Sequence, residues 1–156
     1  MDGYLLVKCA HILSATVLFG TGLGTAAHLW LTHRSGSLPA IAVATAITVR
    51  ADWCFTLTSG LVQPASGAAL IWLGGHDPFA GWLLGAYALY AVAGCCWAVV
   101  VALQIRARDL ARAAIATGQP LPPGYDRLMC LWYGLGWPAF LALIAVFWLM
   151  VAKPGG

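Results

Sequence analysis

Four long apolar runs constrain this chain more than any other feature of its sequence. They extend from about Tyr4 to Leu31, Pro39 to Leu73, Trp82 to Ile105 and Leu128 to Val151. Each has at least the roughly 20 apolar residues that a helix needs to cross a bilayer. Only 8% of the residues are charged, against about 25% in soluble domains. The sequence therefore predicts an integral membrane protein whose first partner is the lipid bilayer.

The predicted fold class is all-α, a polytopic membrane protein built as a four-transmembrane-helix bundle. Transmembrane barrels require alternating segments of about ten residues, and this sequence has none. The breaks "THRSGSLP", "GGHDPFAG" and "RARDLARAAIATGQPLPPGYDR" separate the runs, and their Gly, Pro and charged residues are typical of connections. Since no linker divides the chain, we expect residues 1–156 to form a single four-helix transmembrane domain.

The second run is too long for a bilayer. Its roughly 35 residues would span about 52 Å as a helix, whereas the hydrocarbon core is about 30 Å thick. The run must therefore protrude, tilt or break. We expect Arg50 and Asp52 to mark the inner boundary, with residues 39–49 extending beyond it on the cytoplasmic side and Pro64 bending the spanning part.

The distribution of arginines predicts the orientation of the bundle. The first connection carries Arg34, the third carries Arg106, Arg108, Arg112 and Arg127, and the second has no Lys or Arg. By the positive-inside rule, the first and third connections are cytoplasmic. Both termini are then expected on the periplasmic side of a bacterial inner membrane.

Arg50, Asp52 and Arg106 are predicted to be structural charged residues with partners elsewhere in the bundle. At a spacing of two, Arg50 and Asp52 point to different sides of one helix, so each should find its own partner on another helix. Anchoring at the inner interface is one interpretation, and a proton or anion path is the other. The arginines of the third connection suit anionic lipid, and no feature of the chain requires nucleic acid.

Lys8 and His11 stand one turn apart inside the first apolar run. The long stem of Lys8 can carry its ammonium to the headgroups, whereas an imidazole is too short to reach as far. His11 therefore needs a partner inside the bundle. A hydrogen bond to a neighbouring helix, a proton relay and ligation of a metal or haem iron are all compatible with its position.

Three further patterns bear on a cofactor. The five cysteines have neither CxxC nor CxxCH spacing, so a zinc site and covalent haem attachment are not indicated. The eight tryptophans fit anchoring at the membrane interface, and Trp53, Trp97 and Trp137 are equally candidates to line a flat cofactor pocket. Gly20 and Gly24 have the spacing of a close-packing helix motif.

The two end runs carry a family resemblance. Lys8 is followed by His11 and, two to three turns later, by Phe19, Gly20 and Gly22, while the last run contains Pro138 and ends in Lys153 and Pro154. This pattern resembles the first and last helices of HemJ-type protoporphyrinogen oxidases, and the first run also resembles CopD-like copper-resistance proteins. The whole chain is similar to a small family of bacterial integral membrane proteins known only as a domain of unknown function.

The HemJ resemblance implies a b-type haem. By position, it implies that His11 and Met150 ligate the iron with Lys8 beside the site, and that the protein has a redox or electron-transfer role as a haem-dependent membrane oxidoreductase. HemJ proteins carry an Asn-Glu pair before the proline, where this chain has Gly136 and Trp137. This departure argues against protoporphyrinogen oxidation.

Other ligands and other functions stay open. His28 and His76 are the alternative iron ligands, and His28, about 25 Å from His11 along one helix, would form an inner site with Arg50 and Arg106. The alternative function is a cofactor-free accessory or assembly subunit that docks by its glycine faces onto a larger membrane complex. A second copy of the chain, in a homo-oligomer, is the other candidate partner. A metal or small-ligand transporter is the third possibility, although the chain has only three methionines, too few for a copper-binding cluster.

Overall fold

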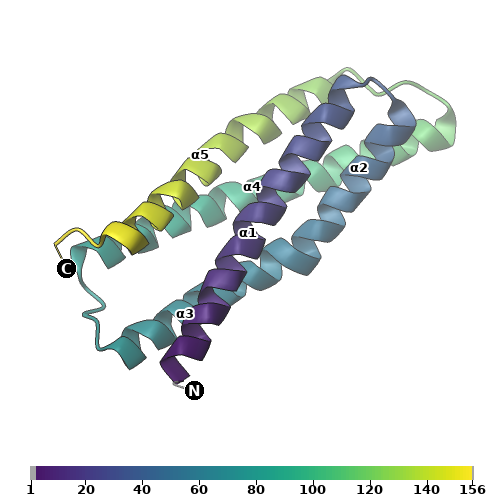
Figure 1. Ribbon diagram of the computed structural model, residues 1–156. Coiled ribbons are helices and arrows are strands. Elements are labelled where there is room, and N and C mark those ends of the chain that lie inside the picture. Colours follow the sequence, from purple (N-terminus) through teal and green to yellow (C-terminus); the bar gives the residue numbers. More distant parts are fainter. Residues whose placement is uncertain (1–2, 156) are drawn as a thin grey trace.

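The computed structural model describes residues 3–155. Its elements are α1 (Gly3–Arg34), α2 (Leu38–Ala51), the π-helical segment η1 (Asp52–Thr56), α3 (Leu57–Gly74), α4 (Gly81–Thr117) and α5 (Gly124–Ala152), and no strand occurs in the described range. Because α2, η1 and α3 follow one another without a break, the chain forms four long rods (Figure 1). Each rod is long and apolar enough to cross a membrane. The predicted all-α architecture with four spans is confirmed.

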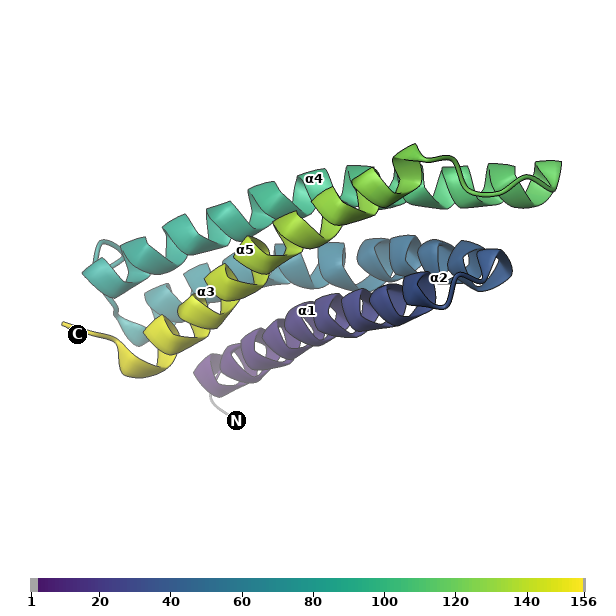
Figure 2. The same cartoon turned by 90° about the horizontal axis from the view of Figure 1, so that it is seen from above.

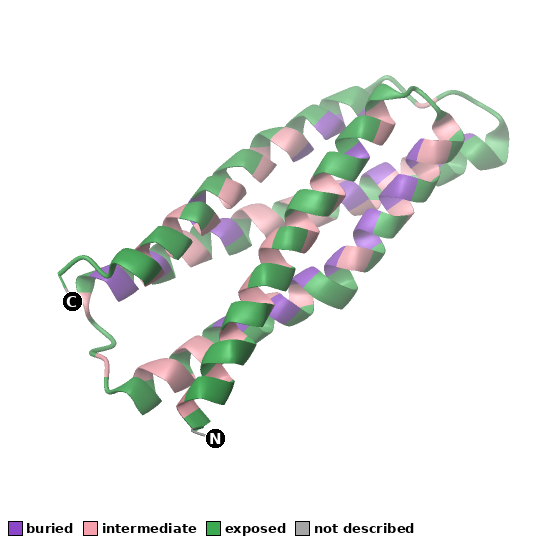
Figure 3. Ribbon diagram, viewed as in Figure 1, coloured by how far each residue is buried: buried purple, intermediate pink, exposed green. Residues whose placement is uncertain are grey.

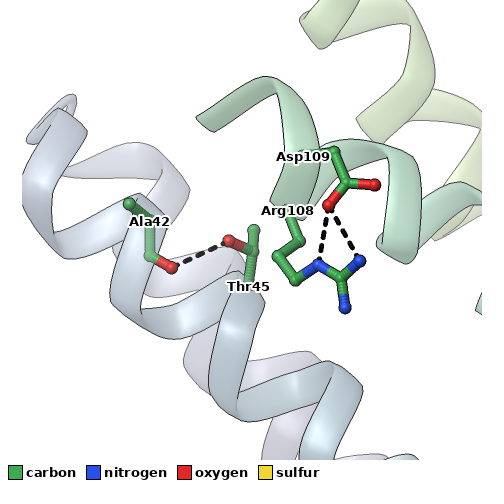
Figure 4. Close-up of polar contacts among 4 residues, drawn as sticks. All are labelled: Ala42, Thr45, Arg108 and Asp109. Atoms are coloured by element: carbon green, nitrogen blue, oxygen red, sulfur yellow. Dashed lines mark hydrogen bonds and ion pairs between the residues drawn. The ribbon is translucent and has the colours of Figure 1, made fainter. Parts of the chain in front are cut away.

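Helices are favoured here because lipid offers no partner to a backbone N–H or C=O group, and a helix pairs these groups internally. Side-chain hydroxyls in the apolar rods are satisfied in the same way. Thr45 donates to Ile41 O at 2.8 Å, and Thr48 donates to Ala44 O at 3.0 Å, one turn back in each case. Thr45 also contacts Ala42 O at 3.1 Å (Figure 4). Most hydroxyls of the rods therefore need no partner from another helix.

The four rods form two pairs that meet at one end. α1 packs along α3, α4 packs along α5, and the two pairs are joined mainly through α2 and α4. We call this end, where the α1–α2 and α4–α5 connections lie, the arginine end. There α2 and the last turns of α4 extend past α1 and α5 (Figure 2). Toward the other end, the terminal end, α1 and α5 diverge (Figure 1).

The main core lies at the arginine end. It comprises Leu29, Ile41, Ala44, Ala107, Ala111, Tyr125, Leu128, Met129 and Trp132. The alanines allow α2 and α4 to approach closely, as small residues do between membrane helices. Buried positions gather along α2 and α4, whereas α1 is exposed or half-buried over most of its length (Figure 3). Exposed apolar side chains on the rods form the surface that lipid covers.

The two longest rods exceed the bilayer. The α2–η1–α3 rod and α4 each have 37 residues, about 55 Å at 1.5 Å per residue. α4 continues twelve residues past the predicted limit at Ile105, to Thr117, because Ala107, Ala111 and Ala114 remain buried on one face. It ends at Gly118, whose φ of 65° is a left-handed conformation that glycine adopts without strain.

Gly20 and Gly24, which have the spacing of a close-packing motif, do not pack against another helix within residues 3–155. A Cβ atom at either position would meet nothing within 4 Å, because both residues lie on the exposed side of α1. Gly22 faces the bundle instead, where a Cβ would lie 3.4 Å from the ring of Phe140. Phe19 packs edge-on against the same ring, with 5.6 Å between centroids. These aromatic contacts hold α1 beside α5.

Candidate functional site

The His11 imidazole is held in one orientation between α1 and α3. Its Nδ1 atom lies 2.8 Å from Ser66 Oγ, and Ser66 Oγ lies 2.6 Å from Val62 O. A hydroxyl has a single proton, which Ser66 donates to the carbonyl, so Ser66 accepts from a protonated Nδ1. The Nε2 atom of the neutral ring is then unprotonated, and within residues 3–155 no hydrogen bond reaches it.

Neighbouring groups fix the backbone under this ring. Gln63 Nε2 donates to His11 O at 2.8 Å and to Ser14 Oγ at 2.7 Å, and Ser14 Oγ donates to His11 O at 3.0 Å. Gly67 leaves room for the imidazole, since a Cβ there would lie 3.5 Å from His11 Cε1. His11 is therefore positioned by two residues of α3 and one of its own helix.

The other residues predicted at a haem site form no hydrogen bond or ion pair with His11 among the described residues. Met150 is half-buried on α5, His76 is half-buried in the α3–α4 connection, and His28 is exposed near the far end of α1. Lys8 is exposed one turn outward from His11.

A second polar site surrounds Asp52, at the start of the π-helical segment. Thr56 Oγ1 donates to Asp52 Oδ1 at 2.7 Å. Gln104 Nε2, on α4, donates to Asp52 Oδ2. Trp132 Nε1, on α5, donates to Gln104 Oε1 at 3.2 Å. All four residues are buried, and we call them the Asp52 network.

The direction of this network follows from its chemistry. An indole N–H can only donate, so the carbonyl of Gln104 must face Trp132 and its amide NH₂ must face Asp52. Thr56 donates to the other carboxylate oxygen. Both oxygens of Asp52 therefore accept hydrogen bonds, which is the arrangement that suits an ionised carboxylate.

No cation accompanies Asp52 within the described part of the chain. Arg50 and Arg106 are exposed, and neither forms an ion pair with it. The ion pairs that occur among residues 3–155 are His33–Asp126 at 3.7 Å and Arg108–Asp109 at 2.8 Å (Figure 4). The partner of Asp52 on another helix is thus the neutral amide of Gln104, whereas Arg50 has no such partner.

An apolar cavity of 860 Å³ lies between the four rods. Asp52 and Gln104 belong to its wall, beside aromatic rings that include Trp97, Trp132 and Tyr133. Of the three tryptophans proposed from the sequence, Trp97 and Trp137 belong to the wall of this cavity, and a cofactor there stays a prediction. Trp53 is half-exposed and does not belong to the wall, since its neighbour Asp52 is the residue that faces inward.

The wall of the cavity includes side chains at the apolar surface of the bundle. Leu23 and Trp30 on α1 and Trp137 and Ile144 on α5 line the cavity, and all four are also exposed at the surface of the molecule. In a membrane that surface is covered by lipid, so a molecule dissolved in the bilayer has a direct path to the cavity.

His11 lies outside this cavity, toward the terminal end. The outermost α1 residue of the wall is Leu18, seven residues from His11 and thus about 10 Å along the helix. Asp52 is 22 residues from the end of α3 at Gly74, about 33 Å. Since His11 contacts Ser66, 14 residues from Asp52, the two polar sites are about 21 Å apart along the second rod.

A comparison with known protein families identifies the family of the chain. Residues 5–154 match the family described as "Predicted integral membrane protein (DUF2269)". The chain belongs to the DUF2269 family. The expected membership in a membrane-protein family of unknown function is thereby confirmed. No curated protein and no solved structure matches this DUF2269 chain, and its likeness to HemJ and CopD-like proteins stays a prediction.

Sequence reasoning missed three residues that position the polar sites of this DUF2269 protein: Gln63, Ser66 and Gln104. Each is a single polar residue in an apolar run, far in sequence from the group that it contacts. A signal was nevertheless present in the second run. Asp52, Thr56, Ser59, Gln63 and Ser66 recur at alternating spacings of four and three, which places them on one face of a helix.

Proposed function

We propose that this DUF2269 protein binds haem b near the terminal end of the bundle and has a redox or electron-transfer role in the membrane. One observation carries the proposal. His11 is hydrogen-bonded through Nδ1 to Ser66, which leaves Nε2 unprotonated and without a partner in the described chain. A histidine that ligates a metal is held in this way, with its other ring nitrogen donating to a fixed acceptor.

The residues near His11 suit a porphyrin better than a bare metal ion. No group of three His, Cys, Asp or Glu side chains gathers anywhere in residues 3–155, so the described residues offer no cluster of ligands for a bare ion. A porphyrin brings four nitrogen ligands and needs only axial ligands from the protein. His11 would provide one, Met150 or His76 a second, and Lys8 would neutralise a propionate. When bound, haem supplies one-electron chemistry.

The chain's own residues orient the His11 imidazole and shield it from water. Ser66 fixes the ring of His11, and Gln63 fixes the backbone that carries it. Exposed apolar side chains on neighbouring turns, including Ile12 and Leu13, place the imidazole in lipid, away from water. A thioether ligand such as Met150 favours ferrous iron and raises the potential.

The proposed setting is a bacterial inner membrane with both termini in the periplasm. The support is the concentration of arginines at one end of the bundle, which the positive-inside rule assigns to the cytoplasm. In this orientation His11 lies in the periplasmic half of the bilayer.

The test is the visible absorption spectrum of protein purified in a neutral detergent from haem-supplemented cells. We expect a Soret band with reducible α and β bands in the wild type and its loss in His11→Ala. His28→Ala is the matched control, because it makes the same change on the same helix, and it should leave the spectrum intact. Met150→Leu should retain haem but shift its midpoint potential.

Ser66→Ala is a more selective test, because it removes only the hydrogen-bond partner of His11 and leaves His11 itself in place. Loss of the hydrogen bond from His11 Nδ1 to Ser66 Oγ should weaken haem binding about 10- to 100-fold, whereas Ser66→Thr, which keeps the hydroxyl, should restore it. A colourless wild type would refute the proposal and favour the cofactor-free accessory subunit. Loss of haem in His28→Ala but not in His11→Ala would place the iron at the arginine end.

A further inference from the structure

Asp52 is a buried carboxylate whose charge the described chain does not balance. Its exposed fraction is 6%, both of its oxygens accept hydrogen bonds from neutral groups, and the nearest arginines in sequence, Arg50 among them, are exposed. An ionised group in an apolar interior is costly unless it is paired. Such a group within membrane helices indicates a functional site by default.

The cavity beside Asp52 shows where a balancing charge would come from. Asp52 and Gln104 are part of the cavity wall, so the carboxylate borders a space of 860 Å³, within the range of about 300 to 1,000 Å³ typical of ligand pockets. We infer that this cavity binds an organic cation with an apolar body, whose positive charge is received by Asp52.

The wall favours an organic cation over a metal ion. Calcium and magnesium require about six oxygen ligands, and no cluster of metal-binding side chains occurs in the described residues. Aromatic faces bind ammonium groups through cation–π attraction. Trp97, Trp132 and Tyr133 line the cavity, and Trp132 lies next to Asp52 through Gln104. The ring of Trp30, which also belongs to the wall, already holds the guanidinium of Arg34, 4.9 Å from its centroid.

The route into the cavity favours an apolar body. Several apolar side chains of the cavity wall are exposed on the surface that lipid covers, so the ligand arrives from the bilayer rather than from water. A lipophilic amine or quaternary ammonium compound partitions into the bilayer and still carries one charge. The inference does not depend on haem, because His11 is outside the cavity wall.

The decisive experiment compares two ligands that differ only in charge. One is 3-phenylpropyl-trimethylammonium, and the other is its neutral isostere with carbon in place of the quaternary nitrogen. Equilibrium dialysis against the purified full-length protein in a neutral maltoside detergent gives both Kd values. We expect the cation to bind at least about tenfold more tightly. Equal affinities, or no binding of the cation, would overturn the inference whatever the behaviour of any variant.

Two matched variants locate the charge that the cation recognises. Asp52→Asn removes the carboxylate charge with little change in shape, and it should weaken binding of the cation to the level of the isostere without altering the Kd of the isostere. Asp109→Asn removes the same charge from an exposed position paired with Arg108, and it should change neither value. Cation binding that survives in Asp52→Asn, or that falls equally in Asp109→Asn, would contradict the assignment to Asp52.

Discussion

Replacing Gln104 with leucine should destabilise the bundle without opening a cavity in it. Gln104 is 1% exposed and links Asp52 to Trp132 through its amide. Leucine is close to glutamine in volume, so packing is conserved and overpacking is small. The substitution therefore isolates the two hydrogen bonds that the amide makes.

The expected loss in the free energy of unfolding follows from the number of polar groups that the substitution leaves without a hydrogen-bond partner. The variant deprives Asp52 Oδ2 of a donor and Trp132 Nε1 of an acceptor. Hydrogen bonds between membrane helices contribute about 0.6 to 1.7 kcal/mol each, and the bond to a carboxylate belongs at the upper end because it is charge-assisted. We therefore expect the free energy of unfolding to fall by about 1 to 3 kcal/mol.

The assay is reversible unfolding by SDS in mixed micelles, followed by tryptophan fluorescence. Gln119→Leu is the matched control, since Gln119 is exposed in the α4–α5 connection and the same chemical change there should alter stability by less than about 0.5 kcal/mol. In a Trp132→Phe background the indole donor is already absent, so the effect of Gln104→Leu should be roughly halved.

Two results would refute this reasoning. If Gln104→Leu were as stable as Gln119→Leu, the Asp52 network would contribute nothing to the fold. If its effect were unchanged in the Trp132→Phe background, Gln104 would act independently of the indole, and the direction assigned to its amide would be wrong.

Two further predictions concern the charged groups and the orientation. Arg50→Ala should change the free energy of unfolding by less than about 0.5 kcal/mol, because Arg50 is exposed. A loss as large as that of Gln104→Leu in the same SDS assay would contradict this prediction and reveal a partner that the described chain does not show. In a background without native cysteines, cysteine at Ser35 or Thr117 should react with a membrane-impermeant maleimide only from the cytoplasmic side, and cysteine at Phe79 only from outside; the reverse pattern would invert the topology.

Much of the fold follows from the sequence because the bilayer limits the choices. Apolar runs longer than about 20 residues must become helices that pair their own backbone groups, and the second run, predicted from Pro39 to Leu73, extends from Leu38 to Gly74. The largest error was at the end of α4, since hydropathy falls where the helix leaves the membrane. Burial of alanines against the other helices extends it further, and hydropathy does not report such packing.

Only one member of each polar pair could be predicted from the sequence. His11 and Asp52 stand out because an ionisable residue in an apolar run is costly and needs a partner. The identity of the partner depends on which helices are neighbours and on how each is rotated. Ser66 lies 55 residues from His11, and Gln104 lies 52 residues from Asp52.

The sequence by itself determined that this protein spans a membrane with four helices, since that outcome depends on composition over whole segments. Only the tertiary structure decided that Asp52 faces Gln104 and Trp132 beside an apolar cavity rather than an arginine at the membrane boundary. The physical reason is that hydropathy sums over many residues and tolerates local exceptions. A hydrogen bond requires two particular atoms to lie within about 3 Å, and the rotation of each helix and its packing against its neighbours decide whether they do.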